Sequence, residues 1–328
     1  MTGKLFWCPP PGVLPPAPVP NRLAANQWRP LAKLEVEMAV AVGAGISGDL
    51  NLRVHDGRLL LSIKGALVWG AGVKGYLTFE VGYESIVALT KLVRQEMAAN
   101  QYKDLEWVET EALAYVKKLS FLGATGIDVA FAYVRGYAIV KEIFDALTQG
   151  DRGGQIAHTL VFDKNQQEIQ EWVYNLQPQA LGPLLMALSS PPASFSVEEE
   201  QENRTFTEDD AHQLQQRAIE QCLRWISTKP NAAKQFEDSI ICMNRDGVRP
   251  AQAGSIYCKN KLKLDTFMAE RVKALDSISN RTRERYREHV AKLGARLNPH
   301  CEYSTTYKGP AFAPIQDTRA AYKGPNID

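Results

Sequence analysis

The sequence predicts an α+β protein in which a four-stranded antiparallel, glycine-rich β-meander is followed by a mostly α-helical body. Three patterns support this prediction. Apolar and polar residues alternate between residues 34 and 82, a glycine-containing motif recurs inside that stretch, and helical spacing of apolar residues begins after Gly82. The chain has 328 residues, of which 45% are hydrophobic, so it is long enough to bury a substantial core.

Prolines crowd the first segment, which we interpret as a Pro-rich linker over residues 1–27. They lie at Pro9, Pro10, Pro11, Pro15, Pro16, Pro18 and Pro20. Proline lacks a backbone N–H and favours extended polyproline geometry, which suits a spacer. A ligand for an SH3-like groove is the alternative interpretation.

The β-meander is predicted within residues 28–82. Alternating apolar residues mark its strands at 34–40, 50–54, 59–63 and 73–81. Asp56 and Gly57 are typical of a tight hairpin turn between the second and third strands. Residues 42–54 align with residues 69–81 as two copies of a strand, a GAGxxG connection and a strand. We therefore expect the glycines in turns and bulges of the sheet.

The connection at residues 43–48, GAGISG, matches the GxGxxG fingerprint of dinucleotide-binding loops. Such a loop must open a helix whose N-terminus holds the pyrophosphate, whereas residues 49–54 alternate as a strand. The second copy, GAGVKG at residues 70–75, is also followed by a strand. We therefore predict no cofactor at either connection.

Helical spacing predicts a first helical region over residues 83–188. One apolar face contains Ile86, Leu89, Val93 and Met97. A second helix carries the seam Leu105, Val108, Ala112, Tyr115, Leu119 and Leu122. A third helix is expected from Ile127 to Leu147, apolar nearly all round in its first half and interrupted by Asp128 and Arg135. We interpret it as a core helix, and insertion of residues 124–140 into a membrane is the alternative.

An acidic, proline-marked run predicts a linker at residues 189–207, before a C-terminal helical region at 208–297. Thr207 is typical of an N-cap, with Asp210 at the third helical position. Residues 298–328 are expected to form an irregular tail.

No pattern in the chain predicts a catalytic, cofactor-binding or metal site. The histidines His55, His158, His212, His289 and His300 form no metal-binding spacing, and the cysteines contain no CxxC pair. His300 and Cys301 are adjacent, but neighbouring side chains rarely adopt the geometry of a nucleophile and its base. An enzyme with an unfamiliar site around Cys301 stays an alternative.

The near-neutral net charge of the chain predicts that any partner is recognised by a local surface and not by the overall electrostatic field. The 38 basic residues nearly cancel the 37 acidic ones, so no global field attracts nucleic acid or an anionic membrane. Arg281, Arg285, Lys292 and Arg296 share one helical surface, but Glu284 and Glu288 interrupt it, as on a solvated helix. The first residues lack the apolar core of a secretory signal, which predicts cytoplasmic synthesis without a cleavable leader.

Several blocks resemble the C-terminal region of large bacterial proteins associated with type VI secretion, the VasX-like, colicin-like toxin group. The blocks are LVWGAGVKG at 67–75, LQPQALGPLL at 176–185, QCLRWI at 221–226, QFE at 235–237 and MNRDG at 243–247. The resemblance covers about residues 28–305 by block and by order. It implies cytoplasmic synthesis, leaderless export by a contractile apparatus and delivery into neighbouring bacteria.

The resemblance implies a non-enzymatic module of an antibacterial effector. Its expected partners are proteins: the remainder of the toxin, a secretion loading factor or an immunity protein. The chain shows neither the N-terminal domain of that group nor its long hydrophobic helices, so pore formation is not carried over and no site residues are transferred. A membrane-perturbing, colicin-like segment and an enzyme with an unrecognised site are the alternatives.

Overall fold

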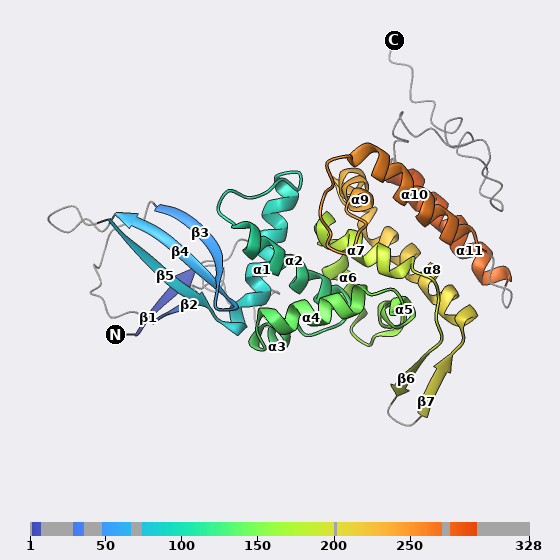
Figure 1. The fold of residues 1–328 in the computed structure, drawn as a ribbon, viewed down its shortest axis with the longest axis horizontal. Coiled ribbons are helices and arrows are strands. Elements are labelled where there is room, and N and C mark those ends of the chain that lie inside the picture. Colours follow the sequence, from blue (N-terminus) through green and yellow to red (C-terminus); the bar gives the residue numbers. More distant parts are fainter. Residues whose placement is uncertain are drawn as a thin grey trace, which may run out of the picture. The chain divides into compact units, whose positions relative to one another are not determined.

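The computed structural model describes residues 2–7, 29–35, 48–66, 74–199, 202–270 and 276–293. Within these ranges the protein is mostly helical and its strands pair antiparallel, so the α+β class is confirmed. The chain divides into two compact units: unit 1 comprises Met1–Gly123 and Ile127–Ile143, and unit 2 comprises Ala124–Gly126 and Phe144–Asp328. Figure 1 labels the elements of both.

Unit 1 combines an antiparallel sheet with helices. Its elements are β1 (Thr2–Trp7), β2 (Arg29–Glu35), β3 (Gly48–His55), β4 (Arg58–Ala66), β5 (Lys74–Val81), α1 (Tyr83–Ala99), α2 (Thr110–Ala124), α3 (Val129–Val134) and the start of α4 (Tyr137–Thr148). The strand order is β1-β2-β5-β4-β3. Strands β3, β4 and β5 follow one another in sequence and lie side by side (Figure 1).

The predicted hairpin between β3 and β4 is confirmed. Asp56 and Gly57 form its turn with φ values of 48° and 74°, in the left-handed region that glycine tolerates best. The ladder runs without interruption from the His55–Arg58 pair to the Gly48–Gly65 pair. Residues 43–47 and 70–73, which include most of both glycine-rich connections, lie outside the described part of the chain.

The predicted order of the meander is wrong at its first strand. A strand was expected at 34–40. Residues 36–40 lie outside the described part of the chain, and β2 pairs with β5, not with β3. A further strand, β1, pairs with β2 and lies within the segment interpreted as a linker. Alternation predicts which face a side chain occupies but not which strand lies alongside, because pairing partners are chosen by tertiary packing.

The core of unit 1 forms where the predicted helical faces meet the sheet. All four residues of the first apolar face and all six of the second are buried. Leu105 and Val108, which were expected on the second helix, precede α2, which begins at Thr110. Leu52, Leu59 and Leu61 are buried on the sheet side. The backbone of the edge strand β3 is hydrogen-bonded to a neighbouring segment at Leu52. The Leu52 N–H donates to Trp107 O at 2.7 Å, and the Leu52 C=O accepts from Glu109 N at 2.9 Å.

The third predicted helix is two helices, α3 and α4. The chain breaks at Gly136, whose φ of 90° is incompatible with a right-handed helix. Asp128 is the N-cap of α3 and accepts from Phe131 N at 3.1 Å. Arg135 is its C-cap, and its guanidinium lies 4.1 Å from the Phe131 ring centroid. The two charged residues therefore terminate α3, which places them at helix ends and not along one continuous helix.

Unit 2 is built around helix α8. Its elements are the end of α4, α5 (Gly153–Phe162), α6 (Gln166–Tyr174), α7 (Pro178–Leu188), β6 (Phe195–Glu199), β7 (Glu202–Phe206), α8 (Glu208–Ile226), α9 (Ala232–Ile241), α10 (Ala253–Ala269) and α11 (Asp276–Lys292). Helices α5, α6, α7 and α11 all contact α8. The predicted capping box is confirmed, because Asp210 N donates to Thr207 Oγ1 at 3.2 Å and Thr207 N donates to Asp210 Oδ2 at 3.0 Å.

Strands β6 and β7 form a hairpin within the stretch expected as an acidic linker, with Phe195 paired to Phe206 at its base. The hairpin projects from the helices of unit 2 (Figure 1). Such a two-stranded ribbon needs packing at its base to be stable. Both phenylalanines are buried and supply that packing.

We expect Tyr133→Phe to lower the free energy of unfolding of unit 1 by about 2 kcal/mol. The buried Tyr133 hydroxyl accepts from Leu59 N at 3.1 Å and donates to Val81 O at 3.0 Å. Its removal leaves one buried donor and one buried acceptor without this partner. Urea unfolding measures the loss. Tyr174→Phe in unit 2 is the control, because the Tyr174 hydroxyl makes no hydrogen bond within the described residues, and an equal loss there would contradict the prediction.

Ionisation of the Tyr133 hydroxyl is also expected to lower the stability of unit 1 at alkaline pH. Burial raises the pKa of Tyr133 to about 12 from the ordinary value of 10.0. Because the folded value is the higher one, this contribution is complete below pH ~10 and is lost as the pH rises through ~12. The stability gap between wild type and Tyr133→Phe should therefore shrink between pH 10 and 12. A gap that stays constant in urea titrations over this range would contradict the expectation.

Candidate functional site

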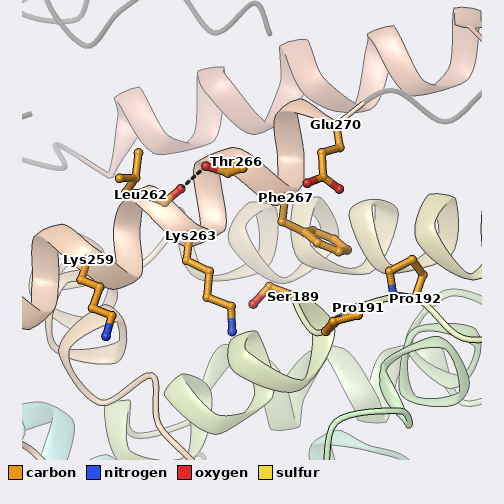
Figure 2. Close-up of a pocket in the computed structure, with 9 residues that line it drawn as sticks. All are labelled: Ser189, Pro191, Pro192, Lys259, Leu262, Lys263, Thr266, Phe267 and Glu270. Atoms are coloured by element: carbon orange, nitrogen blue, oxygen red, sulfur yellow. Dashed lines mark hydrogen bonds between the residues drawn. The ribbon is translucent and has the colours of Figure 1, made fainter. Parts of the chain in front are cut away.

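An open groove of about 500 Å³ lies along α10 in unit 2. We call it the α10 groove (Figure 2). Its lining residues come from α10 and from the end of α7 with the segment that follows it: Ser189, Pro191, Pro192, Lys259, Leu262, Lys263, Thr266, Phe267 and Glu270.

One wall of the α10 groove is a single face of α10. Lys259, Lys263, Phe267 and Glu270 are spaced three or four residues apart and so lie above one another on the helix. The opposite wall contains Pro191 and Pro192, which follow α7. Proline has no backbone N–H and a fixed φ, so this wall presents apolar rings on a stiff backbone.

Buried polar side chains of α8 hold the C-terminal turn of α10, which lines the groove, in place. Gln216 Nε2 donates to Phe267 O at 2.9 Å and to Glu270 O at 3.0 Å. His212 packs against the Phe267 ring with 4.7 Å between ring centroids. The C-terminal turn of α10 is therefore fixed to α8, and the Phe267 ring is directed toward the two prolines (Figure 2).

The groove differs in charge along its length. Lys259 and Lys263 are exposed, and neither pairs with a carboxylate among the residues that the structure describes. Glu270 lies at the other end, with its Oε2 3.8 Å from His212 Nε2. An apolar trough with free ammonium groups at one end suits non-covalent binding of a segment that carries carboxylates there.

Two hydroxyl groups line the α10 groove, and both donate to backbone oxygens. The Ser189 hydroxyl donates to Met186 O at 3.3 Å, and the Thr266 hydroxyl donates to Leu262 O at 2.8 Å. Both hydroxyls thus donate to the backbone of their own helices.

The described histidines lie in different environments. His55 is exposed in the β3–β4 turn, with its Nε2 3.3 Å from Asp56 Oδ2. His212 and His289 are buried on α8 and α11. His300 and Cys301 lie outside the described part of the chain. Within that part, no group of three or more His, Cys, Asp or Glu side chains is arranged to hold a metal ion.

The charged surface predicted on the last helix is mixed in sign. Arg281, Arg285 and Lys292 of α11 are exposed, and Glu284 and Glu288 are exposed among them. Arg296 lies outside the described residues.

Cys222 is expected to resist alkylation in the folded protein. It is fully buried on α8, and burial raises the pKa of its thiol to about 12, with the charge of Glu220 as a secondary cause. Since the thiolate is the reactive form, iodoacetamide at pH 8 should modify Cys222 at least ~100-fold more slowly than in urea. Peptide mapping by mass spectrometry measures this. Equal rates in the folded and unfolded chain would contradict the prediction.

The α10 groove could not be predicted from the sequence. One signal was present, because the Lys259 to Glu270 spacing already puts these residues on one helical face. The prolines of the opposite wall lie in the stretch predicted as a linker, and no local sequence pattern predicts that they face α10.

Comparisons with known proteins add no assignment: no protein-family model, no curated protein and no solved structure matches this chain.

Proposed function

We propose that this chain is a non-enzymatic module of a type VI secretion toxin-like, antibacterial effector protein and acts through protein–protein contacts. The resemblance of the five sequence blocks motivates the assignment to this system. The observation that carries the interaction role is the α10 groove, with its stiff proline wall and two lysines that pair with no carboxylate within the described residues. In this proposal the chain is made in the cytoplasm and leaves by a leaderless route.

The occupant of the α10 groove in this proposal is an extended segment of a protein partner. Apolar side chains of the segment pack between Phe267 and the prolines, and an acidic residue reaches Lys259 and Lys263. Pre-formed walls lower the entropy cost of binding, because only the segment must be ordered. The remainder of the toxin, a secretion loading factor and an immunity protein are the candidate sources of the segment.

Bacterial competition tests this function. Deletion of the coding sequence is expected to change killing of neighbours or self-protection, and a strain carrying Lys259→Glu with Lys263→Glu should behave like the deletion strain. The charge-matched control is Lys103→Glu with Lys141→Glu, two exposed lysines outside the groove, which should behave like wild type. A deletion strain with unchanged killing and self-protection would reject the proposal.

A second candidate function is membrane perturbation by the segment around α3. Phe131 and Val134 of α3 are 55% and 50% exposed, so two large apolar side chains are accessible on one short helix. The helices within the described ranges are each too short or too polar to cross a bilayer, so any contact in this candidate is interfacial. Dye release from anionic liposomes distinguishes it: vesicles that stay intact at micromolar protein remove this candidate.

A further inference from the structure

A row of three aromatic rings with an arginine at each end lies where the β6–β7 hairpin meets α5 and α8. The Arg204 guanidinium carbon is 4.8 Å from the Phe206 ring centroid, and Phe206 is 5.1 Å from His158. His158 is 5.1 Å from Phe162, whose ring lies 5.4 Å from the Arg217 guanidinium carbon. We call these five residues the cation–aromatic row.

The base of the row is rigid. The Phe206 ring stacks on Phe195 with centroids 4.8 Å apart and planes 8° apart. A Cβ on Gly154 would lie 2.7 Å from the Phe195 ring, so α5 passes directly against that ring. The hairpin, α5 and α8 therefore hold the row in one arrangement.

The two ends and the Phe162 ring are available for binding. Phe162 is 48% exposed. Arg204 is exposed, and neither Arg204 nor Arg217 forms an ion pair with a carboxylate inside the described ranges. Asp210 interacts electrostatically with Arg204, and its carboxylate also accepts hydrogen bonds from Thr207 N and Thr207 Oγ1.

We propose that the cation–aromatic row binds a linear protein segment in which an apolar residue is flanked by carboxylates. The apolar residue covers the exposed face of Phe162, and the carboxylates reach the guanidinium groups of Arg204 and Arg217. Guanidinium forms strong, directional hydrogen bonds with carboxylate, and arginines beside aromatic rings are the composition typical of interface hot spots.

A single-stranded nucleic acid is the competing class of ligand, and the surface suits it less. Such ligands stack successive bases on several exposed rings along a basic groove. Here Phe195 and Phe206 are 8% and 4% exposed, which leaves Phe162 as the accessible phenylalanine of this cluster.

Peptide binding to the full chain tests the proposal. The probes are arrays of short peptides with phenylalanine or leucine between glutamates, the same peptides with lysine for glutamate, and the same with serine for the apolar residue. The tightest glutamate–apolar peptide is then labelled with fluorescein and titrated by anisotropy. We expect glutamate–apolar peptides to bind best, and Arg217→Ala or Phe162→Ser to weaken the labelled peptide about tenfold.

Arg224→Ala is the matched control, because Arg224 is exposed on the same helix outside the row, and it should bind like wild type. Arg204→Ala provides a second test at the other end if a variant fails to show the wild-type circular dichroism spectrum. Three results would overturn the proposal: lysine peptides binding as well as glutamate peptides, folded row variants binding like wild type, or a labelled uridylate 12-mer binding more tightly than any peptide. The α10 groove is not probed by these variants, so the outcome is independent of the function proposed above.

Discussion

Gly182→Ala is expected to lower the free energy of unfolding of unit 2 by about 3 kcal/mol. Gly182 lies in α7, where α7 crosses α9. A Cβ at this position would be 2.4 Å from Cys242 O and 2.7 Å from Ser239 O. These are backbone atoms, which cannot move away by a change of rotamer as the end of a side chain can. The two helices must therefore separate to admit one methyl group.

Urea unfolding followed by tryptophan fluorescence measures this loss, and hydrogen exchange of α7 and α9 locates it. Gly82→Ala is the matched control, since an added Cβ there meets nothing within 4 Å and the backbone φ is −72°. It should change the stability by less than about 0.5 kcal/mol. If Gly182→Ala unfolds at the wild-type urea concentration, the close approach of α7 and α9 is wrong.

The helical faces of unit 1 could be predicted because their signal is local. Ile86, Leu89, Val93 and Met97 recur at the helical period, and burying that stripe needs no knowledge of the partner surface. The same holds for the hairpin turn at Asp56 and Gly57, where the residues themselves prefer the required backbone angles. In both places the local preference and the tertiary structure agree.

Helix α5 could not be predicted because its local preference opposes its structure. It begins with Gly153 and Gly154, and glycine disfavours a helix relative to alanine. The tertiary contact explains their presence: an added Cβ on Gly153 would be 2.5 Å from Ala187 O, and one on Gly154 would meet the Phe195 ring. The close packing that these glycines permit outweighs their poor propensity.

The two proposed binding surfaces could not be predicted from the sequence for a related reason. Lys259 and Phe267 share a helical face that could be recognised from spacing, but their opposite wall, Pro191 and Pro192, comes from a stretch that reads as a linker. The cation–aromatic row needs β7 beside α5, and β6 and β7 were not predicted at all. Surfaces made from segments distant in sequence have no local signature, so their chemistry becomes visible only in the folded chain.

Breaking the buried pair between Glu220 of α8 and His289 of α11 is expected to lower the free energy of unfolding of unit 2 by about 3 kcal/mol. His289 Nε2 lies 3.1 Å from Glu220 Oε1, and the two residues are 7% and 6% exposed. His289→Leu leaves the Glu220 carboxyl group buried without this partner. Desolvating a polar group that has lost its partner costs more than the original hydrogen bond contributed.

The double variant separates this explanation from simple loss of packing. Glu220→Leu with His289→Leu removes both polar groups and replaces them with apolar volume, so it should be more stable than His289→Leu alone. Urea unfolding of the two single variants and the double variant completes the cycle. If the losses of stability in the two single variants add up to the loss in the double variant, Glu220 and His289 act independently. A double variant more stable than either single one would show that the pair acts as a unit and fixes α11 against α8, the helix that also holds the C-terminal turn of α10 in place at the α10 groove.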